Sequence, residues 1–159
     1  MINNDVLRSL RYALDLGDHH IVVLCELADP GHVVTVEQVN AWLKADGEPG
    51  HETLPDATLA HVLDGLIVHL RGRDESRPAR PVETRLDNNL ILKKLRVAFE
   101  LRDVDMADIF TSAGFPVSKP EMSALFRQPD HKNFRRAGDQ LLRYFLKGLV
   151  QRVRGGAPR

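Results

Sequence analysis

The chain has little of what disulfide-stabilised, secreted or membrane proteins need. Its 159 residues include one cysteine, Cys25, so no disulfide can form within the chain. No apolar run approaches the ~18 residues that a membrane-spanning helix requires. The opening, MINNDVLRSLRYAL, has an early acid and no continuous apolar stretch, unlike a secretion signal. We therefore expect a cytoplasmic protein without a membrane partner.

Motifs of familiar catalytic sites are also missing from the sequence. There is no G-x-S-x-G elbow, no glycine-rich phosphate loop and no local cysteine–histidine signature. We therefore predict no cofactor, no small-molecule ligand and no catalytic residue. An enzyme stays an alternative, but one whose class the sequence does not assign.

Charge is abundant and unevenly distributed. Hydrophobic residues make up 43% and charged residues 28% of the chain, which is typical of a folded protein and excludes a disordered one. The formal net charge is zero. However, residues 1–71 contain four Lys and Arg against eleven Asp and Glu, whereas residues 86–159 contain fourteen against eight. An acidic half therefore precedes a basic half, and opposed electrostatic fields attract.

The sequence repeats itself with an offset of 85 residues. Eight of sixteen positions are identical between the segments that begin at Asn3 and Asn88, where ordinary composition would give about one identity. Later in the chain the offset becomes 83, and further leucines and glycines recur. The change falls near Pro30–Gly31, where a turn can absorb an insertion. We infer the duplication of one unit.

Each copy has the apolar spacing of four amphipathic helices. The spacing predicts an all-α fold, with two diverged four-helix repeats in tandem. We expect an acidic repeat at 1–71, a charged, proline-containing linker at 72–85, a basic repeat at 86–154 and a flexible tail at 155–159.

Several residues indicate how the helices begin and pack. The side chains that we expect to cap helices, by accepting free backbone N–H groups, are Asn3 or Asn4, Asp18, Thr35, Asn88 or Asn89, Asp103 and Ser118. Gly65 and Gly148 lie in mid-helix in both copies, although glycine costs up to about 1 kcal/mol there relative to alanine. We predict a close approach of two helices at each glycine. Cys25 falls on an apolar face, and we expect it to pack in the core.

Three pairs of segments carry a resemblance to a known family. They are NNDVLRSLRYALDL with NNLILKKLRVAFEL, VTVEQVNAWLK with SKPEMSALFR, and LDGLIVHLRG with LKGLVQRVRG. Together they resemble the YehS-like proteins, a bacterial family of unknown function made of two such units, from Asn3 to about Arg154. The resemblance implies a bacterial cytosolic protein. It implies no activity, because the family has no established substrate or catalytic residues.

Seven histidines raise the question of a metal site. His61, Asp64 and His69 lie roughly on one side of a predicted helix, but no third or fourth ligand is evident beside the two histidines. Zinc sites show tighter signatures than two histidines eight residues apart. The other copy has no potential ligand set at these positions, which are held by Tyr144, Lys147 and Arg152. We predict no metal.

A basic stripe on the last predicted helix is the candidate binding surface. Its members, at spacings of four and seven, are Arg143, Lys147 and Arg154. Lys132 and Arg136 would extend the stripe only if the helix ran unbroken through Gly138, and we expect the helix to begin there instead. Several such cations can grip a nucleic-acid backbone. The segment 105–127 also resembles a helix-turn-helix, but its connection is about two residues longer than that tight turn allows.

The interpretation that these observations favour is a non-enzymatic protein-interaction or regulatory module. An acidic unit fused to a basic one can dock on a protein partner, or head to tail on a second copy of the chain. Nucleic-acid binding by the basic second repeat is the first alternative, and an enzyme is the second. The interaction module is preferred mainly by elimination.

Overall fold

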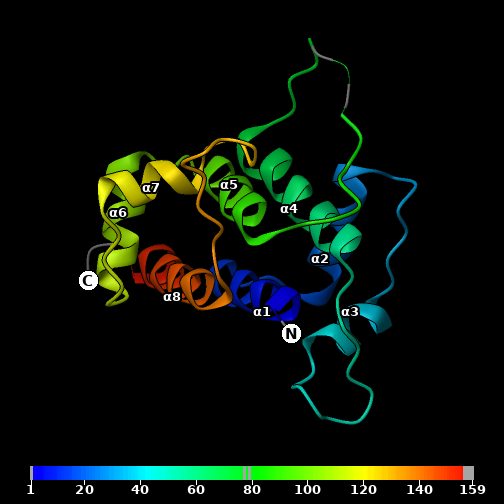
Figure 1. Ribbon diagram of the computed structural model, residues 1–159. Helices are drawn as coiled ribbons and strands as arrows, with labels where there is room; N and C mark the ends of the chain where they lie inside the picture. Colours follow the sequence, from blue (N-terminus) through cyan, green and yellow to red (C-terminus); the bar gives the residue numbers. More distant parts are fainter. Residues whose placement is uncertain (1, 77, 79, 156–159) are drawn as a thin grey trace. The chain divides into compact units, whose positions relative to one another are not determined.

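The computed structural model describes residues 2–76, 78 and 80–155. Within these ranges the chain forms eight helices and no strand (Figure 1), which confirms the predicted all-α fold. Two compact units, Met1–Leu86 and Asp87–Arg159, contain four helices each. The helices are α1 (Ile2–Leu14), α2 (Asp18–Ala28), α3 (Val36–Leu43), α4 (Asp56–Arg71), α5 (Asn88–Ala98), α6 (Asp103–Ser112), α7 (Lys119–Leu125) and α8 (Asp139–Gly155). No helix of the described part is long and apolar enough to cross a membrane.

Each unit buries the apolar stripes that the sequence predicts. In the first unit α2 packs mainly against α4, and in the second unit α6 packs mainly against α8. Fully burying one leucine or phenylalanine stabilises a fold by roughly 1.5–3 kcal/mol. Cys25 is fully buried, and burial raises the pKa of its thiol to about 12. Its counterpart in the second unit, Phe110, is buried to the same degree, so the packing role predicted for Cys25 is confirmed.

The two repeated glycines lie where two helices touch. A Cβ atom built on Gly65 of α4 would lie 1.8 Å from the carbonyl oxygen of Leu24 in α2. A Cβ atom built on Gly148 of α8 would lie 2.2 Å from the carbonyl oxygen of Ile109 in α6. No side chain fits at such distances, which confirms the predicted close approach in both copies.

Helices α3 and α7 begin with the predicted caps. The Thr35 hydroxyl accepts a hydrogen bond from the backbone N–H of Gln38 at 3.1 Å, and the Ser118 hydroxyl accepts one from that of Glu121 at 3.3 Å. The predicted asparagine caps are wrong, and so are the predicted caps Asp18 and Asp103. These two aspartates are the first helical residues of α2 and α6, after the N-cap residues Gly17 and Arg102. Asn3 and Asn4 lie inside α1, and the cap of α5 is Asp87, whose carboxylate accepts from the N–H of Leu90 at 2.8 Å.

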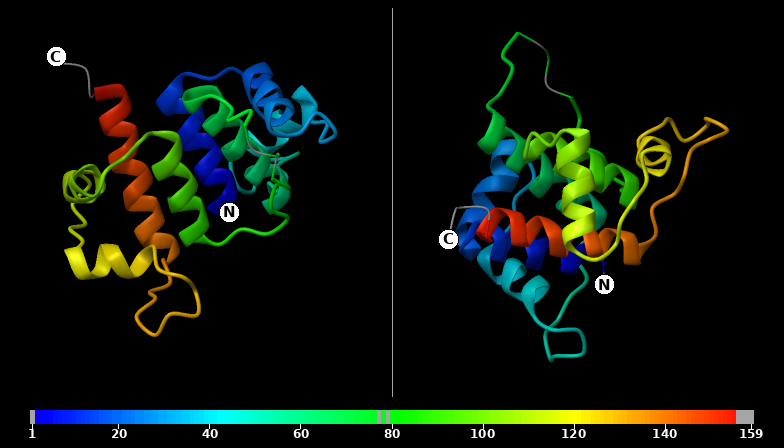
Figure 2. Two further views of the ribbon diagram at one scale, coloured as in Figure 1. Left: turned by 90° about the horizontal axis from the view of Figure 1, so that it is seen from above. Right: turned by 90° about the vertical axis from the view of Figure 1, so that its left-hand side faces the viewer.

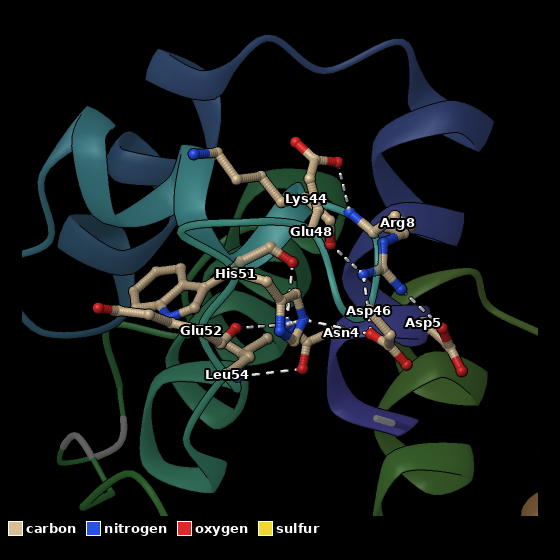
Figure 3. A network of polar contacts seen from close by, with 11 residues as sticks. Asn4, Asp5, Arg8, Lys44, Asp46, Glu48, His51, Glu52 and Leu54 are labelled. Atoms are coloured by element: carbon tan, nitrogen blue, oxygen red, sulfur yellow. Dashed lines mark hydrogen bonds and ion pairs between the residues drawn. The ribbon is translucent and has the colours of Figure 1, made fainter.

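The asparagines instead bind a distant part of their own unit. Figure 3 shows Asn4 pointing from α1 into the connection between α3 and α4. Its amide donates to the carbonyl oxygens of Trp42 and Glu52, both at 2.9 Å, and its oxygen accepts from the N–H of Leu54 at 3.1 Å. Asn4 is fully buried, so these bonds satisfy polar groups that water does not reach.

The second unit repeats this arrangement bond for bond. The Asn89 amide donates to the carbonyl oxygens of Leu125 at 2.9 Å and Arg135 at 2.8 Å, and its oxygen accepts from the N–H of Ala137 at 2.9 Å. The neighbouring Asn88 donates to the carbonyl oxygen of Ala137 at 3.1 Å. The buried asparagine therefore fastens the long connection that precedes the last helix of each unit.

The segment after α4 is held against the first unit at both ends. Arg73 donates to the carbonyl oxygen of Leu27 at 2.5 Å, and the N–H of Leu86 donates to the Asp56 carboxylate at 3.0 Å. The chain thus leaves the end of α4 and returns to its beginning (Figure 1). In the predicted tail, Gly155 is the last residue of α8, and residues 156–159 lie outside the described part.

Candidate functional site

The three cations of the predicted stripe share one exposed face of α8. Arg143, Lys147 and Arg154 are all exposed. At 3.6 residues per turn they lie within about 40° of one another, and they extend over ~16 Å of the helix. The opposite face of α8 is buried in the core through Leu142, Phe145 and Leu149. The amphipathic pattern that anchors α8 therefore also directs these side chains to solvent.

The two remaining cations lie outside α8. Lys132 and Arg136 are exposed residues of the connection between α7 and α8, since α8 begins at Asp139. This connection projects from the second unit as the orange loop of Figure 2. The expectation that a helix begins after Gly138 is confirmed, and the stripe consists of the three α8 residues.

Other arginines of the second unit are held in ion pairs. Arg102 and Arg152 both bind the Asp105 carboxylate, at 3.2 Å and 2.8 Å. Hydrogen bonds from the side chain and backbone of Arg102 hold the pKa of Asp105 at about 2, well below its usual value. Arg96 binds Asp103 at 2.5 Å. These contacts partly neutralise the acids of α6, and one of the arginines that does so, Arg152, lies on α8 itself.

The segment that resembles a helix-turn-helix does not contain a basic recognition helix. Its connection between α6 and α7 spans residues 113–118, and α7 has only seven residues. Glu121 of α7 forms an ion pair with Arg135. A recognition helix presents several donors to base edges or cations to phosphates. The charged side chains of α7 are one cation, Lys119, and one acid, Glu121, that is already bound.

The first unit presents acids on its surface. The exposed ones among the described residues are Asp15, Glu26, Asp29, Glu37, Asp46, Glu48, Glu52, Asp74 and Glu75. Ion pairs engage some of these acids: Arg8 binds Asp46 at 3.4 Å, and the His51 ring lies 3.2 Å from the same carboxylate. The uneven charge of the sequence is therefore also a property of the two folded surfaces.

A pair of stacked rings occurs at equivalent places in the two units. In the first unit the rings of His32 and His61 stack at 3.8 Å, with an angle of 14° between their planes. In the second unit the rings of Phe115 and Tyr144 stack at 4.8 Å, with an angle of 10°. Each pair joins the connection after the second helix of the unit to its last helix. Of these two pairs, only that of the first unit consists of imidazole rings, the side chain whose ordinary pKa lies near neutral pH.

Hydrogen bonds orient both histidines. His61 is buried, and its Nδ1 donates to the carbonyl oxygen of Ala57 at 2.6 Å, which leaves Nε2 3.8 Å from the Asp29 carboxylate. Nε2 of His32 lies 3.1 Å from the hydroxyl of the buried Thr58. The third residue of the predicted one-sided set, His69, is exposed. Within the described residues, no three or more His, Cys, Asp and Glu side chains gather as a metal site would require.

Comparison with known proteins gives the same two segments. The chain matches the family described as "Protein of unknown function (DUF1456)" over residues 3–72 and again over residues 88–155. The chain belongs to the DUF1456 family. It is also 48% identical over 153 residues to the "Uncharacterized protein YehS" of Escherichia coli strain K12, which covers 96% of each chain. No solved structure matches the chain.

The two DUF1456 segments contain every feature that the units share. Each has the buried asparagine, the glycine at the helix contact and the stacked ring pair. The segment between them, residues 73–87, includes the part of the chain that returns along α4. The resemblance recognised from the paired motifs is thus confirmed, and the family description carries no activity.

The histidine pair predicts an acid-sensitive first unit. Burial lowers the pKa of His32, the charge of His61 lowers it further, and Asp29 partly opposes both. Because the fold favours neutral His32, its contribution to stability is full above the usual pKa of about 6.5 and is lost as the pH falls below that value. Urea unfolding followed by fluorescence of Trp42, the chain's one tryptophan, should show a lower midpoint near pH 5.5 than near pH 7.5.

A matched variant isolates this effect from other titrating groups. Replacing His32 by Phe and His61 by Tyr installs the rings of the second unit in the first. The double variant should lose less stability between the two pH values than the parent chain does. An equal loss in both proteins would show that the histidine stack is not the acid-sensitive element.

Proposed function

We propose that this DUF1456 protein is a non-enzymatic binding or regulatory module of the bacterial cytosol. In this proposal, the exposed basic face of the second unit binds an acidic surface of a partner protein. The observation that carries the proposal is the stripe of Arg143, Lys147 and Arg154 on α8. The three side chains lie on one exposed face of a helix whose opposite face is buried in the core.

Complementary surface charges affect the choice of partner and the rate of association more than they affect the binding affinity. Complementary potentials steer encounter and exclude partners of like charge, whereas exposed pairs add little stability individually. The acidic first unit then serves two purposes in the proposal. It repels acidic molecules that approach its own surface, and it offers a second surface for a basic partner.

Charge reversal on α8 tests the proposal. The variant Arg143→Glu with Lys147→Glu should lose most of the proteins that the parent chain captures from bacterial lysate at low salt, because attraction becomes repulsion. Captured proteins would be identified by mass spectrometry, before and after nuclease treatment. Both positions are exposed, so the variant should retain the parent's helical circular dichroism.

A second charge reversal of equal size serves as the control. Lys93→Glu with Arg127→Glu changes the net charge by the same amount at exposed sites outside α8. If both double variants lose the same proteins, total charge decides capture, and the α8 stripe is not the binding site. If the α8 variant captures the same proteins as the parent chain, the proposal is wrong.

Nucleic acid is the alternative occupant of the same stripe, because its three aligned cations can also follow a phosphate backbone. Binding through three phosphates would give a slope of about −2.7 in a plot of log K against log salt. Binding of mixed-sequence duplex that shows this slope and disappears in the α8 variant would favour the alternative. In that case nuclease treatment should also release the captured material.

A further inference from the structure

A cleft in the second unit lies apart from the α8 stripe. It lies between α6 and α7 and has a volume of about 460 Å³. Its apolar lining comes from Val104, Ala107, Val117 and Met122, and its polar lining from Asp103, Lys119 and Ser123. Val104 is 52% exposed, the largest exposed fraction among the large hydrophobic residues of the described second unit. This size and lining are typical of a site that accepts apolar groups.

The charges at the cleft favour the binding of an acidic group. Asp103 already binds Arg96 at 2.5 Å, which offsets its negative charge. Lys119, in the first turn of α7, is exposed at the same edge. An apolar group that carries a carboxylate beside it can therefore bury its apolar part against Val104 and Met122 and place its carboxylate near Lys119.

The first unit presents an apolar group of that kind. Val33 is 77% exposed, the largest fraction among the large hydrophobic residues of the described first unit, and Val36 is 38% exposed. Glu37 follows directly in α3 and is exposed. The acidic unit thus carries a small exposed apolar group beside a carboxylate. We call this segment, Val33–Glu37, the knob.

The fold holds this knob in place. His32 stacks on His61, and Val34 is 5% exposed, so the residues on either side of Val33 are anchored in the unit. The backbone at Val33 is therefore fixed on both sides, and it holds the side chain in an outward direction. A preorganised group loses less conformational entropy on binding.

We propose that a second copy of this chain fills the cleft, with the Val33–Glu37 knob of one copy seated between α6 and α7 of the other. Val33 and Val36 contact Val104 and Met122, and Glu37 pairs with Lys119. The surfaces are different on the two sides, so the contact is head to tail and can be extended by further copies. This proposal concerns a surface separate from the α8 stripe, and each can fail alone.

Complementation between two variants tests the head-to-tail contact in the full chain. Val33→Asp damages the knob and leaves the cleft intact, whereas Val104→Asp does the reverse. By sedimentation velocity, the average mass of the parent chain should rise with concentration, and each variant alone should stay monomeric. An equimolar mixture should form a heterodimer that does not grow, because one intact knob and one intact cleft remain.

Several results would overturn this proposal. They are a parent chain that stays monomeric at all concentrations, single variants that associate as the parent does, and a mixture that remains monomeric. A monomeric parent whose Val104→Asp variant stops capturing other proteins would assign the cleft to a different partner. Val97→Asp, at another exposed apolar site, is the control and should associate like the parent. Circular dichroism of every variant verifies that it is folded.

Charge reversal supplies an independent measure of the same contact. Glu37→Lys and Lys119→Glu should each weaken self-association about tenfold, and the chain with both changes should recover most of the loss. Failure of the double change to recover would remove the Glu37–Lys119 pair from the proposal. The α8 variant Arg143→Glu with Lys147→Glu should still self-associate, which separates this result from the test of partner binding.

Discussion

Gly65→Ala should destabilise the first unit by roughly 2–3 kcal/mol, the cost of overpacking a well-packed contact. The new methyl group would lie 1.8 Å from the carbonyl oxygen of Leu24, so α2 and α4 must move apart and lose part of their packing. The sign of the change in stability distinguishes a close helix contact from an exposed helix position, because alanine stabilises an exposed helix by up to about 1 kcal/mol relative to glycine. Urea unfolding followed by Trp42 fluorescence measures the free energy of unfolding of this unit.

The second unit offers the same experiment with a control of the same type. Gly148→Ala should destabilise it to a similar extent, because its methyl group would lie 2.2 Å from the Ile109 carbonyl oxygen. At Gly138 nothing lies within 4 Å of an added Cβ, so Gly138→Ala should change stability by less than about 0.5 kcal/mol. Stability that is unchanged or increased in Gly65→Ala and Gly148→Ala would contradict the close helix contact.

Asn4→Ala should cost the first unit roughly 3 kcal/mol, and Asn89→Ala should cost the second unit about as much. Each change removes three hydrogen bonds, two of them buried and one partly buried. In the first unit, the N–H of Leu54 and the carbonyl oxygens of Trp42 and Glu52 lose their partner. Leaving a buried polar group without a partner costs more free energy than a satisfied hydrogen bond contributes, because that bond only replaces one to water in the unfolded chain. Urea unfolding measured by circular dichroism reports both units.

Two further variants show whether the loss of stability comes from the hydrogen bonds. One keeps the side-chain volume at Asn4, and the other removes an amide at an exposed site. Asn4→Asp keeps the volume but replaces the donating amide group by a carboxylate oxygen that faces two carbonyl oxygens, so it should destabilise the unit at neutral pH at least as much as alanine does. Asn40 is exposed on α3, where its amide donates to the Val36 carbonyl oxygen of its own helix at 3.1 Å. Asn40→Ala should therefore change stability by less than about 0.5 kcal/mol. Equal losses in Asn4→Ala and Asn40→Ala would remove the special role of the buried asparagine.

Features that depend on near neighbours in the chain could be predicted from the sequence. Apolar residues three and four positions apart determine which face of a helix is buried, so the helices and the exposed α8 stripe followed from spacing. The caps Thr35 and Ser118 bind an N–H only three residues away. The glycine contacts were also predictable, because an unfavourable residue that recurs in both copies requires a common cause.

The roles of Asn4 and Asn89 could not be predicted in this way. An asparagine near the start of a helix suits an N-cap, and the sequence contains nothing that distinguishes this use from a bond to a residue 50 positions away. The stacked rings were missed for the same reason, since the connection that carries His32 meets α4 only in the folded unit. The comparison of the two copies places His61 and Tyr144 at one position, but it does not show that each has a second ring stacked on it.

The sequence by itself determined an all-helical chain, its duplication and the opposite charges of the two copies, because helical periodicity, repeated residues and charge are properties of order along the chain. Only the tertiary structure decided which side chains hold the connections, which arginines are engaged in ion pairs and where an apolar knob and an apolar cleft are exposed. Those outcomes depend on contacts between segments that lie tens of residues apart. Packing, rather than local preference, selects them.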